Sequence, residues 1–168
     1  MTDQVNTRGL ALEFLLEVEK GALSHVALRG MLERYRYLDK QERAFLTRLC
    51  EGTLERRLEL DAIINHFSKV PVKKQKPVIR NLLRMSVYQL KYMDQIPDSA
   101  VCNEAVKLAQ KKGFSSLKGF VNGVMRNVAR KKEEITYPDA KTSPAEYLSV
   151  YYSVPQWLVE RWVKAYGT

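Results

Sequence analysis

The sequence contains very little cysteine and histidine. Its 168 residues include 2 cysteines, Cys50 and Cys102, and 2 histidines, His25 and His66. The cysteines lack Cys-X-X-Cys spacing and offer no disulfide framework, so both are expected to be buried small hydrophobic residues. The histidines are isolated from other ligand-forming residues, which gives neither a metal site nor a catalytic triad. The sequence therefore predicts no metal.

Long hydrophobic runs are also missing. No stretch approaches the roughly 18 apolar residues that a membrane-spanning helix needs. The opening MTDQVNTRGL has neither the basic region nor the apolar region of a secretion signal. No membrane partner is expected, and the predicted location is the cytoplasm. With 45% hydrophobic and 28% charged residues, the chain is typical of a globular protein with one full domain and a fragment of a second.

Motifs for nucleotide or methyl-transfer chemistry are absent. The segment KGFVNG (118–123) has a helical pattern and differs from the GXGXXG of a phosphate-binding loop. Neither cysteine has the adjacent proline and downstream glycines expected of a pyrimidine methyltransferase nucleophile. We therefore expect this chain, taken alone, to be non-catalytic and to hold no cofactor.

Acidic residues are missing from two long stretches, and this segregates the charge. None occurs between Asp61 and Asp94, or between Glu104 and Glu133. Residues 62–132 carry 15 Lys or Arg against 3 Asp or Glu (net +12), and the other residues carry 13 against 16 (net −3), which together give the total of +9. A segregated basic field favours a polyanion partner, usually nucleic acid, over a surface that only keeps the protein soluble.

Apolar residues recur at the 3.6-residue period of α-helices along nearly the whole chain, and strand-like alternation is absent. The fold class is therefore all-α. A basic link bounded by prolines, VPVKKQKP (70–77), separates four earlier helices from three later ones. The residues expected to cap or start helices are Asn6 or Thr7, Ser24, Asp39, Pro77, and Asp98 or Ser99; Gly21 and Gly113 are expected to end two of them.

The helix after Pro77 has an apolar stripe and, on its other side, a basic line. The stripe predicts a core helix. The line includes Tyr88, which offers a stacking face, although Tyr88 can also face inward and Arg84 can pair with Glu104. The stripe is Ile79, Leu82, Leu83, Ser86, Val87 and Leu90, and the basic line is Arg80, Arg84, Tyr88 and Lys91.

The last helix of the basic region shows a second polar side, and after it the composition changes. Gly119 and Gly123 weaken that helix, so they are expected to serve close packing. ITYPDAKTSPAEY (135–147) is typical of a linker, and another helix is predicted to begin at Pro155. The polar side consists of Lys118, Asn122, Arg126 and Arg130.

The chain resembles the NusB-like domain, an all-helical RNA-binding module. The resemblance lies in LLRMSVYQLKYMDQIPDSAVCNEAVKLAQKKG (82–113), followed by KGFVNGVMRNVAR (118–130), and it extends over roughly residues 5–132. RGLALEFL (8–15) and DKQERAFLTRLCEGTL (39–54) agree with it. The tail YLSVYYSVPQWLVERWVKAYG (147–167) resembles the junction that follows this module in the RsmB/Sun family of 16S ribosomal RNA cytosine-C5 methyltransferases.

The resemblance implies a domain organisation and a function. Residues 1–133 would form a NusB-like bundle of two packed three-helix subbundles. Residues 134–168 would form a linker and a short helical extension, the first helix of the junction to a methyltransferase domain. The chain would be the RNA-binding, non-catalytic N-terminal domain of the methyltransferase. Its partners would be 16S ribosomal RNA and its own C-terminal domain, and S-adenosylmethionine would belong to the full-length parent.

The resemblance also implies roles for single residues. NusB contacts RNA through an arginine-rich N-terminus, and here Arg8 alone stands in that place. The family's Asn-Glu-Ala maps to Asn103, Glu104 and Ala105, and its Phe-Val-Asn ends at Asn122. We expect Glu104 to pair with Arg84 or Arg126, and Asn122 to be a buried or half-buried hydrogen-bonding centre.

Two other interpretations remain open. One is a free NusB-type transcription antitermination factor that binds RNA and a ribosomal protein, and the other is a helical protein-interaction module. The RNA-binding hypothesis rests on the basic sides of the late helices and on the link, because lysines there are unlikely to be buried. The predicted RNA-binding residues are Arg8, Lys73, Lys74, Lys76, Arg80, Arg84, Lys111, Lys112, Lys118, Arg126 and Arg130.

Overall fold

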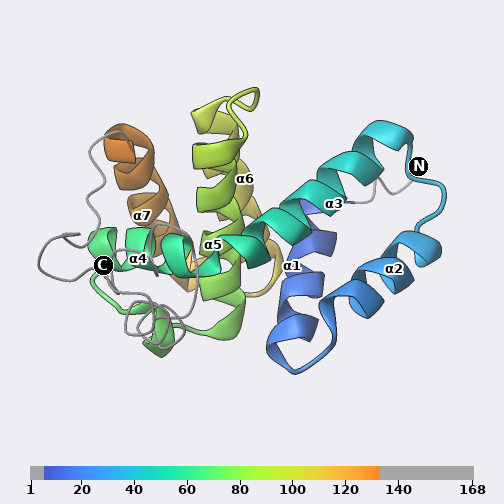
Figure 1. Cartoon of the computed structure of the whole chain (residues 1–168). Coiled ribbons are helices and arrows are strands. Elements are labelled where there is room, and N and C mark those ends of the chain that lie inside the picture. The colour runs from blue at the N-terminus through green and yellow to red at the C-terminus, as the bar shows by residue number, and fades with distance from the viewer. Residues whose placement is uncertain (1–5, 133–168) are drawn as a thin grey trace, which may run out of the picture.

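The computed structural model describes residues 6–132, which fold into α-helices and short 3-10 helices without a strand in that range (Figure 1). The all-α prediction is confirmed. The predicted linker and helical extension (134–168) lie outside the described residues. The elements are α1 (Thr7–Glu19), α2 (Ser24–Arg34), α3 (Lys40–Glu55), α4 (Arg57–Phe67), η1 (Val72–Lys74), α5 (Pro77–Tyr92), α6 (Asp98–Lys111), η2 (Ser115–Leu117) and α7 (Lys118–Lys131).

Side-chain caps fix the starts of two helices. The Asn6 side chain accepts a hydrogen bond from the N–H of Gly9 (3.1 Å), and Asp39 accepts one from the N–H of Glu42 (2.8 Å). Both caps confirm the sequence prediction. The caps predicted at Ser24 and at Asp98 or Ser99 are wrong, because α2 and α6 begin after Leu23 and Pro97 without a side-chain cap.

Glycine ends α1 and α6, as the sequence predicts. Gly21 and Gly113 have φ angles of +112° and +88°. These angles lie in the left-handed region that residues with a Cβ rarely adopt. The chain therefore turns sharply after each of these helices.

The helices form two subbundles that share α5. Helices α1 to α3 make the first subbundle, and α4, α6 and α7 pack around α5 to make the second (Figure 1). The predicted two-subbundle arrangement is confirmed, with α4 as a fourth helix of the second subbundle. Because α5 also contacts α1 and α3, every residue from 81 to 90 is buried.

Short connections make α5, α6 and α7 run alternately up and down. The start of α5, the end of α6 and the start of α7 therefore lie at the same end of the second subbundle, the lower end in Figure 1. α1 runs antiparallel to α5, because Arg8 contacts Gln89 whereas Glu19 contacts Arg80. This geometry decides which basic residues lie together.

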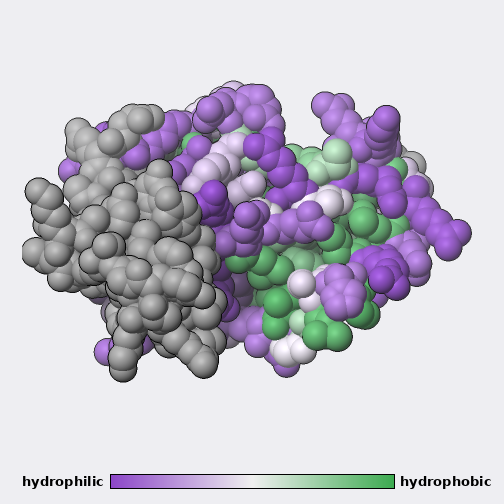
Figure 2. Space-filling view, viewed as in Figure 1, coloured by the Kyte–Doolittle hydropathy of each residue, from purple (hydrophilic) through white to green (hydrophobic). Residues whose placement is uncertain are grey.

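Hydrophobic residues gather on the surface of the first subbundle. Figure 2 shows them on the side occupied by α1 to α3, whereas hydrophilic residues cover most of the remaining described surface on that face. Leu23 and Val26, at the start of α2, are 64% and 53% exposed. Across residues 6–132, no helix has both the length and the apolar character that crossing a bilayer requires.

Candidate nucleic-acid interface

The link between α4 and α5 carries three exposed lysines, Lys73, Lys74 and Lys76. Val72 and Gln75 alternate with these lysines and are buried. Because the two buried residues face inward, Lys73 and Lys74 between them and Lys76 after them face solvent. The link therefore presents three positive charges immediately before α5.

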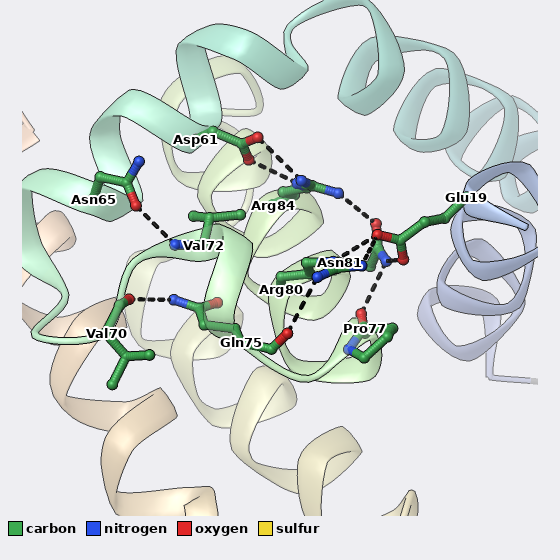
Figure 3. Close-up of polar contacts among 10 residues, drawn as sticks. All are labelled: Glu19, Asp61, Asn65, Val70, Val72, Gln75, Pro77, Arg80, Asn81 and Arg84. Atoms are coloured by element: carbon green, nitrogen blue, oxygen red, sulfur yellow. Dashed lines mark hydrogen bonds and ion pairs between the residues drawn. The ribbon is translucent and has the colours of Figure 1, made fainter.

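Hydrogen bonds hold the link in place (Figure 3). The backbone N–H of Val72 donates to Asn65 Oδ1 at 2.8 Å, and Gln75 Nε2 donates to the carbonyl oxygen of Val70 at 2.9 Å. The anchors come from α4 and from the link itself. The lysines are thus mounted on ordered backbone, which lowers the entropy cost of binding a ligand.

Further lysines occupy the same end of the second subbundle. Lys111 and Lys118 are exposed, and Lys112 lies 3.6 Å from Glu13 Oε1 of α1. These residues end α6 and begin α7, so the alternating directions of the helices place them near the start of α5. We name as the basic end the residues Lys73, Lys74, Lys76, Lys111, Lys112 and Lys118.

Arg84 is an internal residue (Figure 3). It is 9% exposed, and its Nε and Nη2 donate to Asp61 Oδ1 and Oδ2 at 2.6 and 3.0 Å. Its Nη1 donates to Asn81 Oδ1 at 3.1 Å. This paired geometry uses the guanidinium within the protein. Arg84 therefore stabilises the contact between α4 and α5 and has little surface in contact with solvent.

The rest of the predicted basic line on α5 is also used internally. Arg80 Nε donates to Glu19 Oε1 at 2.6 Å, Tyr88 is buried, and Lys91 Nζ donates to Glu59 Oε1 at 2.5 Å. The prediction that this line forms an open RNA-facing side is wrong. The physical reason is that other helices surround α5 over residues 81–90, and Arg80 and Lys91, which are only partly exposed, pair with acids of neighbouring helices.

Arg8 lies far along α5 from the three lysines of the link. Its Nε donates to Gln89 Oε1 at 2.9 Å, and its guanidinium lies 5.4 Å from the Phe45 ring centroid. Burial lowers the pKa of Arg8, while the negative charge of Glu104 opposes that shift. Gln89 follows Lys76 by 13 residues, which is about 20 Å along α5. Arg8 therefore cannot contact the same phosphates as the link.

Arg8 instead lines a cleft of 920 Å³ beside the contact between the two subbundles. Charges of both signs line it: the acids are Asp39, Glu42 and Glu104, and the cations are Arg8, Arg48 and Lys111. Because the acids offset the cations, this cleft lacks the uniform positive potential of the link, where Lys73, Lys74 and Lys76 have no acid between them.

A second groove lies between α6 and α7, with a volume of 530 Å³. Arg126 is exposed there, and it donates from Nη2 to Asn103 Oδ1 (3.1 Å) and from Nε to Asn122 Oδ1 (3.3 Å). Arg130 lies one turn further along α7 and donates to Asn127 Oδ1 at 2.8 Å. The residues lining this groove are Asn103, Val106, Lys107, Lys118, Gly119, Asn122 and Arg126.

Three expectations for α6 and α7 are wrong. Asn122 is exposed rather than buried, and Glu104 lies near Lys107 (3.7 Å) instead of pairing with either predicted arginine. A Cβ placed at Gly119 or Gly123 meets no neighbouring atom within 4 Å, so these glycines do not serve close packing in the described part of the chain.

Some site residues were not found by sequence reasoning. Asn65 and Gln75, which order the link, carry no periodic or charge signal. Asn103 was noted only through the family's Asn-Glu-Ala, which does not reveal its contact with Arg126. As for metals, the part of the chain that the structure describes has no group of three His, Cys, Asp or Glu that could hold one.

The NusB family matches residues 5–130 of the chain, nearly the whole described range. The chain belongs to the NusB family. This confirms the sequence-based resemblance, and the structure agrees. The crystal structure of antitermination factors NusB and NusE in complex with dsRNA matches with a TM-score of 0.67 at 22% identity, covering 74% of this chain and 93% of the other. That likeness shows the fold.

Two relatives represent two kinds of protein to which the chain is similar. The chain is 38% identical over 165 residues to the probable ribosomal RNA small subunit methyltransferase B of Bacillus subtilis, a match that covers 98% of this chain and 36% of that protein. It is 31% identical over 137 residues to the transcription antitermination protein NusB of Acidothermus cellulolyticus, covering 81% and 93%. The chain thus spans about a third of the methyltransferase relative.

Proposed function

We propose that this chain is the RNA-binding, N-terminal domain of an S-adenosylmethionine-dependent 16S ribosomal RNA cytosine-C5 methyltransferase. The observation that carries the proposal is the match to the Bacillus subtilis methyltransferase relative along 98% of this chain, although only 36% of the relative is covered. The uncovered part of such a protein has room for the cofactor and the nucleophile. In this proposal the NusB-family domain grips the RNA and presents it to the catalytic domain.

The basic end supports RNA binding. Its exposed lysines are not paired with carboxylates of the described residues, except that Lys112 lies near Glu13. Unpaired lysines displace counterions from RNA phosphates, which contributes a favourable, salt-dependent term to binding. Because phosphate contacts position the RNA without reading its bases, this surface suits a docking role.

The test is a charge-removal series on a fragment of 16S ribosomal RNA, with fluorescence anisotropy at several salt concentrations. Changing Lys73, Lys74 and Lys76 to Gln should weaken binding and lower the salt slope by about one unit per lost phosphate contact. The matched control changes three exposed cations of the first subbundle, Lys20, Arg34 and Arg36, to Gln. Equal losses in both variants would overturn the proposal and favour a protein-interaction module.

The antitermination factor remains the second candidate, because the chain covers 93% of the Acidothermus cellulolyticus NusB. The length of the reading frame distinguishes the two candidate functions. A reading frame that continues into a methyltransferase domain supports the first, and one that stops close to residue 168 supports the second. Methylation of 16S ribosomal RNA by the full-length product, and its loss when the domain is deleted, would agree with the first.

A further inference from the structure

Arg126 is held in a way that preserves its charge. Two neutral amide oxygens, from Asn103 and Asn122, accept hydrogen bonds from its guanidinium at 3.1 and 3.3 Å. Arg84, by contrast, is bound by the carboxylate of Asp61, which cancels its charge. An amide orients a guanidinium without neutralising it, so Arg126 is fixed in direction and still fully positive.

The arrangement leaves hydrogen-bond donors facing the groove. A guanidinium has five N–H donors, and the two amides use one on Nε and one on Nη2. Because the oxygens of Asn103 and Asn122 are engaged, their NH₂ groups are free to donate. Within residues 6–132, no carboxylate forms an ion pair with Arg126. The site thus has the chemistry of an anion receptor.

The groove extends from this receptor to the basic end. Lys118, at the start of α7, and Lys107, which is 71% exposed in its side chain, lie along it. The eight residues from Lys118 to Arg126 rise by about 12 Å. Gly119 adds no side chain to the floor, and a Cβ there would meet nothing within 4 Å. The groove therefore offers a positively charged track that is open at Gly119.

We propose that the groove between α6 and α7 binds a single strand of RNA, with Arg126 as the phosphate ligand and Asn103 and Asn122 as its positioning residues. The strand lies against Gly119 and continues toward the lysines of the basic end. This inference rests on the proposed RNA-binding function and adds that the bound RNA includes an unpaired segment. In this proposal a duplex binds mainly through phosphate contacts at the basic end and gains little from the groove.

The first experiment compares Arg126→Gln with Lys131→Gln, an exposed cation of α7 that does not line the groove. The probes are a single-stranded oligonucleotide from 16S ribosomal RNA and the same sequence as a duplex. For the single strand, Arg126→Gln should weaken binding about tenfold and lower the salt slope by about one unit. Lys131→Gln should change the affinity less than twofold. Equal losses of single-strand affinity in the two variants, or a loss of affinity for the duplex alone, would overturn the proposal that the groove binds a single strand.

The second experiment tests the positioning residues. Asn122→Asp keeps an oxygen for Arg126 but adds a negative charge that cancels it, so single-strand binding should fall about as far as in Arg126→Gln. Asn127→Asp makes the same change beside Arg130, outside the groove, and should have little effect. Similar losses in both would show that only the net charge of α7 matters.

The third experiment fills the groove. Gly119→Leu should lower single-strand affinity by about tenfold or more without lowering the free energy of unfolding, because the new side chain meets no protein atom at its base. The groove proposal fails if Gly119→Leu and Arg126→Gln keep full affinity while the variant with Lys73, Lys74 and Lys76 changed to Gln loses affinity. That result would leave the proposed RNA-binding function standing. If the unchanged chain binds none of these RNAs, both proposals fail.

Discussion

Gly52 of α3 and Tyr88 of α5 are in direct contact, and the tyrosine ring and hydroxyl occupy the space that a side chain on residue 52 would need. The glycine lets α3 approach α5, and this approach joins the first subbundle to the second. Gly52→Ala should therefore lower the free energy of unfolding by about 3 kcal/mol, because a buried methyl group would push the ring aside. Urea unfolding followed by circular dichroism measures the change, and an alanine tolerated without loss would contradict this packing.

Gly123 provides the opposite case on α7. It is exposed and lies in the middle of the helix, and a Cβ added to it would meet no neighbouring atom within 4 Å. Gly123→Ala should raise the free energy of unfolding by about 0.5–1 kcal/mol, because alanine loses less backbone entropy in a helix. Urea unfolding of Gly52→Ala and Gly123→Ala should give changes in the free energy of unfolding with opposite signs. Changes of the same sign would contradict the described packing.

The ion pair between Arg84 and Asp61 should be worth more than the surface pair between Lys112 and Glu13. Asp61→Ala leaves the buried guanidinium of Arg84 without its counter-charge and should cost about 3 kcal/mol. Glu13→Ala removes a partner that is 46% exposed and should cost less than about 0.5 kcal/mol. Thermal unfolding of the two variants at the same pH distinguishes them. Equal costs would mean that Arg84 is better solvated than described.

Core packing of α5 gives a further prediction. Leu83 and Leu90 are 0% and 1% exposed within the stripe that the sequence shows. Leu83→Ala or Leu90→Ala should lower the free energy of unfolding by about 2–5 kcal/mol, because buried methylene groups are lost and a cavity remains. Leu23→Ala, at an exposed site of α2, is the control and should stay within about 0.5 kcal/mol.

Cys50 should make stability fall at alkaline pH. Burial raises the pKa of its thiol from about 9 to about 12, with a smaller contribution from Glu51. Above pH 9 the unfolded chain releases this proton and the folded chain keeps it, so the contribution present below pH 9 is lost progressively up to pH 12. Between pH 9 and 10, the wild type should lose up to about 1.4 kcal/mol more per pH unit than Cys50→Ala. Identical slopes in urea unfolding would show that Cys50 ionises in the fold.

Local signals account for the part of the fold that the sequence predicts. The caps at Asn6 and Asp39, the glycine turns and the stripe through Leu83 are each encoded within a few neighbouring residues. The exposure of Lys73, Lys74 and Lys76 follows from the cost of burying an ammonium group. These features need no knowledge of distant contacts, so they can be inferred from the chain alone.

The misassigned residues depend on distant partners. Arg84 is 23 residues from Asp61 in sequence, and Arg80 is 61 residues from Glu19. One apolar stripe predicts one buried face, but residues 81–90 of α5 are buried on every side. A helical period in the sequence cannot show this, because the burial depends on helices that lie far away in the chain. The open surface at Gly119 was missed for a related reason. The four-residue spacing of Gly119 and Gly123 looks the same in the sequence whether another helix packs against these glycines or they face solvent.

The position of α5 has a consequence for how the protein is made. Helices α1 to α3 come first along the chain, but they pack on a helix that spans residues 77–92. A nascent chain that has released only the first subbundle from the ribosome exposes the apolar faces that α5 later covers, and such faces attract chaperones or other nascent chains. We therefore expect stable folding to begin only once α5 has left the exit tunnel, so a pause in translation before that point would favour aggregation.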